Sequence, residues 1–131
     1  MEIKAVEAQS LVDSGSPTLI VCVADWCPHC QELKKEFEPL QHLAAQYNIN
    51  LEVIKVTEPE NQEFLTKNPF ETLPYCLVFV GKEFKGGENA SAQMLMQLMP
   101  ALAEAVAREN IINAQATLNN PEFTTLNEQP S

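Results

Sequence analysis

The passage from an apolar run into two closely spaced cysteines constrains the fold more than any other feature of this chain. Residues 19–24 (LIVCVA) are rich in β-branched side chains and follow a Gly-Ser-Pro turn signal, which predicts a strand buried on both faces. The motif WCPHC occupies residues 26–30, and apolar residues then recur at helical spacing. The cysteines therefore lie at a turn from a buried strand into a helix, which Pro39 is expected to kink.

The rest of the chain predicts alternating strands and helices. Further strands are expected at residues 51–56 and 75–80, and a Gly-Lys turn leads into a third at 83–85, which Gly86 and Gly87 end. A last helix carries the apolar stripe Leu95, Leu98, Met99, Leu102 and Val106 after a cap at Asn89 or Ser91. A short edge strand at 3–6 and a helix at 7–13 precede all of these.

Composition indicates one domain with its own core. With 131 residues and 45% hydrophobic content, the chain needs neither metal nor disulfide staples to fold. From residue 113 it turns polar and loses periodicity. We expect a domain over residues 1–112 and a loosely packed tail over residues 113–131.

The charge of the chain excludes two classes of partner. Eighteen acidic and eight basic residues give a formal charge of −10, which repels nucleic acid and anionic membranes. The first 20 residues lack the pattern of a signal peptide, and no apolar stretch reaches the roughly 20 residues that span a bilayer. We expect a cytoplasmic monomer, or a periplasmic or exported protein if a signal peptide has been removed.

Two cysteines in this spacing can bind a metal, form a structural bridge, or open and close as a catalytic disulfide. Zinc sites usually take a second pair of ligands, but Cys22 and Cys76 are single residues inside predicted strands. A structural bridge around so small a loop would constrain the unfolded chain little. The redox interpretation is therefore favoured, with no metal, and we take Cys22 and Cys76 as small buried hydrophobes.

The motif has the features of an activated dithiol. Cys27 would lie at a helix start, where free backbone N–H groups and the helix dipole stabilise a thiolate. Pro28 suits the first helical position, and His29 adds a switchable positive charge. We expect Cys27 to be the exposed nucleophile and Cys30 the shielded thiol that resolves the mixed disulfide.

The order of these elements resembles the thioredoxin superfamily over roughly residues 1–110: strand, WCPHC, amphipathic helix, strand, TLP (residues 72–74), hairpin and final helix. The resemblance implies an α/β thioredoxin fold, with a mixed sheet of four to five strands flanked by helices on both faces. It also implies a cis peptide bond before Pro74, facing the cysteines. The backbone of Leu73 would pair with an extended substrate, and Trp26 would complete the docking surface.

Within the superfamily the resemblances are divided. The Trp-Cys pair and Lys55 are similar to thioredoxins, the Pro-His dipeptide to the oxidising DsbA proteins, and TLP followed by Gly86-Gly87 to glutaredoxins. We interpret the two glycines as a strand end or bulge. Thioredoxins bury an acid where this chain has Val21. Lys55 would lose that partner, and Asp25 is the nearest replacement, so these two are the candidate proton relay.

These features together predict a thiol–disulfide oxidoreductase that acts on protein or glutathione disulfides in electron transport and cell redox homeostasis. Its only redox group would be the Cys27–Cys30 disulfide, without a bound cofactor. A reductase or glutathione would supply electrons. The alternative is a thioredoxin-like binding or adaptor module whose cysteine pair is not its main activity, which the absence of the buried acid favours.

Overall fold

The computed structural model describes residues 2–118 and places the strands in one five-stranded sheet with the order β1-β3-β2-β4-β5. The strands are β1 (Glu2–Ile3), β2 (Thr18–Val23), β3 (Asn50–Lys55), β4 (Tyr75–Val80) and β5 (Glu83–Asn89). The helices are α1 (Ala5–Asp13), α2 (Pro28–Lys34), α3 (Phe37–Gln46), the short 3-10 turn η1 (Pro59–Asn61), α4 (Gln62–Lys67) and α5 (Ala92–Leu118). The first three strands are parallel, whereas β4 and β5 are antiparallel to their neighbours, so the sheet is mixed.

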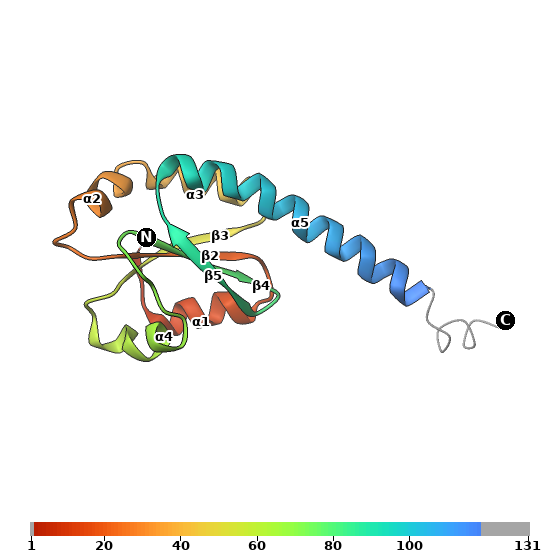
Figure 1. Cartoon of the computed structure of the whole chain (residues 1–131), viewed down its shortest axis with the longest axis horizontal. Coiled ribbons are helices and arrows are strands. Elements are labelled where there is room, and N and C mark those ends of the chain that lie inside the picture. Colours follow the sequence, from red (N-terminus) through yellow and green to blue (C-terminus); the bar gives the residue numbers. More distant parts are fainter. Residues whose placement is uncertain (1, 119–131) are drawn as a thin grey trace.

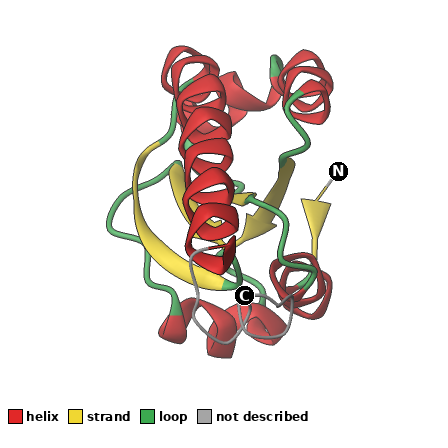
Figure 2. Cartoon of the chain, turned by 90° about the vertical axis from the view of Figure 1, so that its right-hand side faces the viewer, coloured by secondary structure: helices red, strands yellow, loops and turns green. Residues whose placement is uncertain are grey.

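Helices cover both faces of this sheet. Figures 1 and 2 show α3 and α5 on one face and α1 and α4 on the other. Two buried clusters follow from this layering: Leu19, Val21 and Leu95 lie in the first, and Ile20, Cys22 and Phe79 lie in the second. The expected α/β architecture with helices on both faces is confirmed.

Strand β2 lies at the centre of the sheet and determines where the cysteine motif begins. All six of its residues are buried, because β3 and β4 pair with its two edges and helices cover its two faces. This explains why the sequence shows a continuous apolar run here rather than alternation. The chain leaves the sheet after Val23, so the next residues emerge at its carboxyl edge.

Three of the expected elements differ from the structure. The edge strand expected at 3–6 ends at Ile3, and helix α1 already begins at Ala5. Pro39 does not kink one helix; instead, the helix breaks between Lys34 and Phe37 into α2 and α3, because a proline ring collides with the carbonyl group four residues earlier. Strand β5 does not end at the glycine pair but continues to Asn89. A register shift in the β4–β5 ladder and a φ of +99° at Gly86 show a bulge there, which was one of the two interpretations of these glycines.

Helix α5 begins at the expected cap and carries the expected apolar stripe. The Ser91 hydroxyl accepts a hydrogen bond of 3.0 Å from the Met94 N–H group. Leu95, Met99 and Leu102 are buried against the sheet. The helix runs to Leu118, past the expected start of the tail, and residues 119–131 lie outside the described part. The boundary between domain and tail stays a prediction.

Candidate active site

The two cysteines of the motif form a disulfide at the start of helix α2. Cys27 is the N-cap residue, Pro28 occupies the first helical position, and Cys30 follows within the first turn. The Cys30 N–H group donates a hydrogen bond of 3.2 Å to the Cys27 sulfur. A thiolate formed at Cys27 would thus meet a backbone donor and the positive end of the helix, both of which stabilise a negative charge.

The residues of the motif differ sharply in exposure. Trp26 is 70% exposed, and His29 and Pro28 are also exposed, whereas Cys27 is 4% exposed and Cys30 is fully buried. The expectation of an exposed Cys27 is wrong for this oxidised form, because its sulfur is bonded to the buried Cys30. The order of the two is as expected, with Cys27 nearer the surface.

The segment before strand β4 presents an unpaired backbone to the surface. The Leu73–Pro74 peptide bond is cis, Pro74 is buried, and the Pro74 carbonyl accepts a hydrogen bond of 2.9 Å from the Ala90 N–H group. Within residues 2–118, the backbone of Leu73 has no hydrogen-bond partner. Its N–H and C=O groups are therefore available to an extended chain.

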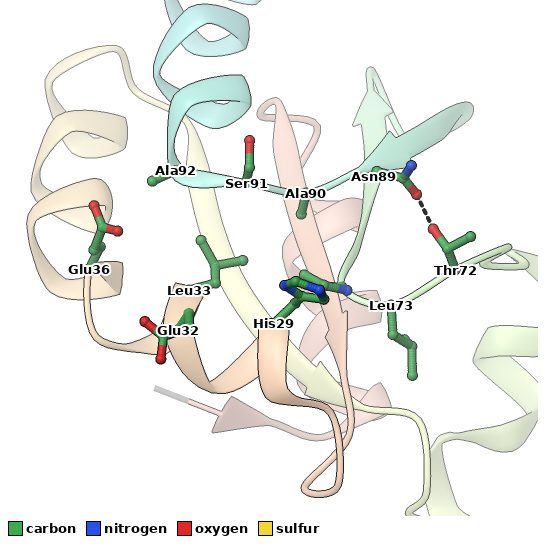
Figure 3. A pocket seen from close by; sticks show the side chains of 11 residues that line it. His29, Glu32, Leu33, Glu36, Thr72, Leu73, Asn89, Ala90, Ser91 and Ala92 are labelled. Atoms are coloured by element: carbon green, nitrogen blue, oxygen red, sulfur yellow. Dashed lines mark hydrogen bonds between the residues drawn. The ribbon is translucent and has the colours of Figure 1, made fainter.

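A cavity of about 420 Å³ lies beside the cysteine motif, between helix α2 and the start of α5. Figure 3 shows Glu32 and Glu36 at one side of it, Thr72 and Asn89 at the other, and the His29 ring between Glu32 and Leu73. The Thr72 hydroxyl is hydrogen-bonded to the Asn89 side chain, which links the two segments of the far wall. The volume of the cavity falls within the ~300–1,000 Å³ usual for ligand pockets.

Lys55, at the end of β3, has two acidic partners. Its ammonium group lies 3.3 Å from the Asp25 carboxylate and 3.4 Å from that of Glu2, and Glu2 also pairs with Lys34 on α2. The hydrogen bond to Asp25 and the charge of Glu2 raise the pKa of Lys55. Burial alone would raise the pKa of Glu2, but the contacts with Lys34 and Lys55 outweigh it and lower that pKa.

Val21 occupies the position at which thioredoxins are expected to bury an acid, and it is fully buried in the same cluster as Cys30. The charged residue nearest to Val21 in the sequence is Asp25, which pairs with Lys55 at the surface. The structure brings Asp25 and Lys55 together as a pair, but it places them outside the buried cluster rather than within it.

Cys22 and Cys76 are buried and free. Cys22 belongs to the cluster under α1 and α4, whereas Cys76 belongs to the one that contains Cys27 and Cys30. Burial raises the pKa of the Cys22 thiol to about 12 and that of Cys76 further still. Both thiols stay protonated and unreactive near neutral pH.

Among residues 2–118, no three His, Cys, Asp or Glu side chains gather as they would around a metal ion. In the same part of the chain, no helix combines the length and the apolar character needed to span a bilayer.

Sequence reasoning missed Glu2, Lys34 and the acidic wall of the cavity. Glu2 pairs with Val53 in the β1–β3 ladder, which makes it a diagonal neighbour of Lys55, but that register is set by tertiary structure. Glu32 and Glu36, in contrast, are four residues apart after the motif. That spacing on a helical segment was a signal that could have placed both on one face.

A mixed five-stranded sheet with helices on both faces and a CxxC disulfide at a helix N-terminus define a thioredoxin-fold dithiol protein. The family model for thioredoxin matches residues 3–104, so the chain belongs to the thioredoxin family. Membership of this family together with a CxxC pair supports thiol–disulfide oxidoreductase activity in general.

Known proteins resemble the chain at low identity. It is 24% identical over 86 residues to "Thioredoxin X, chloroplastic" of Arabidopsis thaliana, covering 65% of this chain and 46% of that one. It is 30% identical over 84 residues to "Protein disulfide-isomerase tigA" of Aspergillus niger, covering 60% of this chain and 23% of that one. The chain thus spans less than half the length of these two relatives. The structure of oxidised thioredoxin O1 from Arabidopsis thaliana superposes with a TM-score of 0.64 at 20% identity, over 77% of this chain and 95% of that one, which confirms the fold.

Proposed function

We propose that the chain exchanges electrons with disulfides of other proteins through the Cys27–Cys30 pair. The observation that carries the proposal is the placement of this disulfide at the N-terminus of α2, beside a cavity whose far wall has a free backbone at Leu73. The redox group is the dithiol itself, and no further cofactor is invoked.

The proposed reaction has two steps. The Cys27 thiolate attacks one sulfur of the substrate disulfide, which breaks that bond, forms a mixed disulfide and releases the first substrate thiol. The Cys30 thiolate then attacks the Cys27 sulfur, which closes the Cys27–Cys30 disulfide and releases the second substrate thiol. Two electrons and two protons pass from the dithiol to the substrate, and a protein reductase or glutathione restores the dithiol.

Helix α2 favours the first step. The N–H group that donates to the Cys27 sulfur and the helix dipole both stabilise the thiolate, and protonated His29 adds a positive charge nearby. Stabilising the thiolate also stabilises the reduced form, which makes the pair more oxidising than an unstructured dithiol. The reverse reaction, oxidation of substrate thiols, is therefore open to the same site.

We further propose that Trp26, Leu73 and Pro74 dock the substrate. Trp26 offers a large exposed apolar surface directly before Cys27, and the Leu73 backbone offers a donor and an acceptor. Backbone pairing of this kind positions an extended segment without demanding a particular sequence.

The second step needs a proton acceptor for Cys30. Since Val21 cannot accept a proton, we propose that Asp25 and Lys55, through water, serve this purpose. This route is longer than direct transfer to a buried acid, so the resolving step is expected to be slow.

A Cys30→Ser variant tests the proposal. It should accumulate mixed disulfides with a peptide disulfide, seen as a mass increase by mass spectrometry, whereas Cys27→Ser should form none. Cys22→Ser is the matched control, because it removes a buried thiol away from the motif and should resolve normally. If neither the wild-type protein nor Cys30→Ser exchanges with any disulfide, the oxidoreductase proposal fails, and the binding-module alternative takes its place.

A further inference from the structure

The cavity beside the cysteine motif is lined by negative charges without lysine or arginine to balance them. Its lining contains two carboxylates, Glu32 and Glu36, together with His29, and no lysine or arginine. Within residues 2–118 Glu36 has no ion pair, and Glu32 pairs only with Lys35, where both side chains are about 70% exposed. Such an exposed pair neutralises little of the local field.

Two further glutamates, outside the lining of the cavity, are sequence neighbours of residues in its far wall. Glu71 adjoins Thr72, and Glu88 adjoins Asn89, the two residues that are hydrogen-bonded across the far wall. Both glutamates are exposed, and neither forms an ion pair in the described part of the chain. A formal charge of −10 for the whole chain acts in the same direction.

The cysteine pair and the Leu73 backbone at the edge of the cavity determine where a substrate lies in it. A substrate that pairs with the Leu73 backbone would bring the residues next to its cysteine towards Glu32 and Glu36 across the cavity. Long cationic side chains at these positions would be attracted by Glu36, which has no ion pair within residues 2–118, and by Glu32, whose single pair is exposed, whereas anionic side chains would be repelled.

We propose, resting on the oxidoreductase function above, that the site selects protein disulfides whose cysteine is flanked by lysine or arginine and disfavours the anionic glutathione disulfide. The exchange is the same two-step transfer from the Cys27–Cys30 dithiol, and a dithiol reductant such as dithiothreitol restores it. The same negative charge disfavours glutathione as the electron donor.

The test uses three short peptide disulfides that differ only in the residues beside cysteine: lysine, glutamine or glutamate. The reduced full chain is mixed with each, and Trp26 fluorescence follows its oxidation. At ~0.01 M salt the rate constants should fall in the order lysine, glutamine, glutamate, with glutathione disulfide below the glutamine peptide. At ~1 M salt, where the Debye length shrinks from ~30 Å to ~3 Å, the differences should collapse.

Charge-neutralising variants locate the effect. Glu36→Gln and Glu32→Gln should each reduce the lysine-over-glutamate ratio by roughly 1.5- to 5-fold, the range for one exposed charge pair. Glu38→Gln is the matched control: it changes the net charge equally, but Glu38 lies on α3 beside Pro39 and His42, outside this cavity. Its ratio should match the wild type.

Three results would overturn the proposal. Equal rates for the lysine and glutamate peptides would show that the site does not discriminate by charge. An equal drop in Glu38→Gln would assign selection to the net charge rather than to the cavity. An undiminished preference in the Glu32→Gln/Glu36→Gln double variant would exclude these carboxylates. Failure of the neutral glutamine peptide to react is a different result, because it refutes the exchange activity itself and the specificity with it.

Discussion

Replacing the buried Asn61 with alanine should destabilise the fold, because it removes two hydrogen bonds of the side chain. Asn61 is one of two buried polar residues of the described chain, and its side chain joins three elements. Its Oδ1 atom accepts a hydrogen bond of 2.8 Å from the Ala5 N–H group, a donor at the start of α1 without an intrahelical partner. Its Nδ2 atom donates one of 2.8 Å to the carbonyl group of Lys55, at the end of β3.

The magnitude follows from what the substitution leaves behind. Asn61→Ala would strand one donor and one acceptor in partly buried surroundings, at about 1–1.5 kcal/mol each, so the free energy of unfolding should fall by about 2–3 kcal/mol. For a domain of this size that corresponds to a loss of roughly 8–12 °C in the melting temperature.

The neighbouring residue supplies the control. Gln62 also donates two side-chain hydrogen bonds, of 2.7 Å to the Val56 carbonyl and 3.0 Å to that of Glu58, but it is exposed. Water can replace both bonds in Gln62→Ala, so its cost should stay below about 1 kcal/mol. Urea unfolding followed by circular dichroism measures both variants. If Asn61→Ala costs no more than Gln62→Ala, burial does not determine the strength of these bonds, and the reasoning is refuted.

Two further predictions concern the sheet and the ion pairs near the motif. Gly87→Ala should lower the free energy of unfolding by about 3 kcal/mol, measured by urea unfolding, because a Cβ atom there would collide with the Cys76 carbonyl oxygen and lie 2.7 Å from the Tyr75 ring. Gly81 has open space around it and a φ of 58°, so Gly81→Asn should be nearly neutral. Equal costs for the two variants would contradict this. Glu2→Gln should cost about 0.2–1 kcal/mol at pH 7. The folded-state pKa of Glu2 is lowered from 4.5, so the stabilisation by its ion pairs is complete above that value and is lost as the pH falls through the lowered pKa. The stabilities of the wild type and Glu2→Gln should therefore converge in acid. A stability difference that does not change with pH would rule out the ion pairs as its source.

Local sequence signals predicted the frame of the fold well. The apolar run before the motif became β2, and the apolar stripe of the last helix packs against the core as expected, because both patterns show which faces must avoid water. The position of the CxxC pair at a strand-to-helix turn followed from the apolar run before it and from the helical spacing of the apolar residues after it.

Features that depend on which segments meet were harder to predict. The contact of Lys55 with Glu2 depends on the pairing of β1 with β3, and one of the two partners of Asn61 is Ala5, which is far away in the sequence. Neither has a local periodic signal. Pro39 was interpreted as a kink within one helix, but it lies in the first turn of α3, where a proline is tolerated and marks the start of a new helix.

The two free cysteines, Cys22 and Cys76, lie on opposite faces of the sheet and can report which helical layer separates from it. A thiol reagent can reach Cys22 only if the layer of α1 and α4 separates from the sheet, and Cys76 only if the layer of α3 and α5 does so. Labelling of the native chain therefore distinguishes departure of one layer from departure of the other, and simultaneous labelling marks loss of the whole fold.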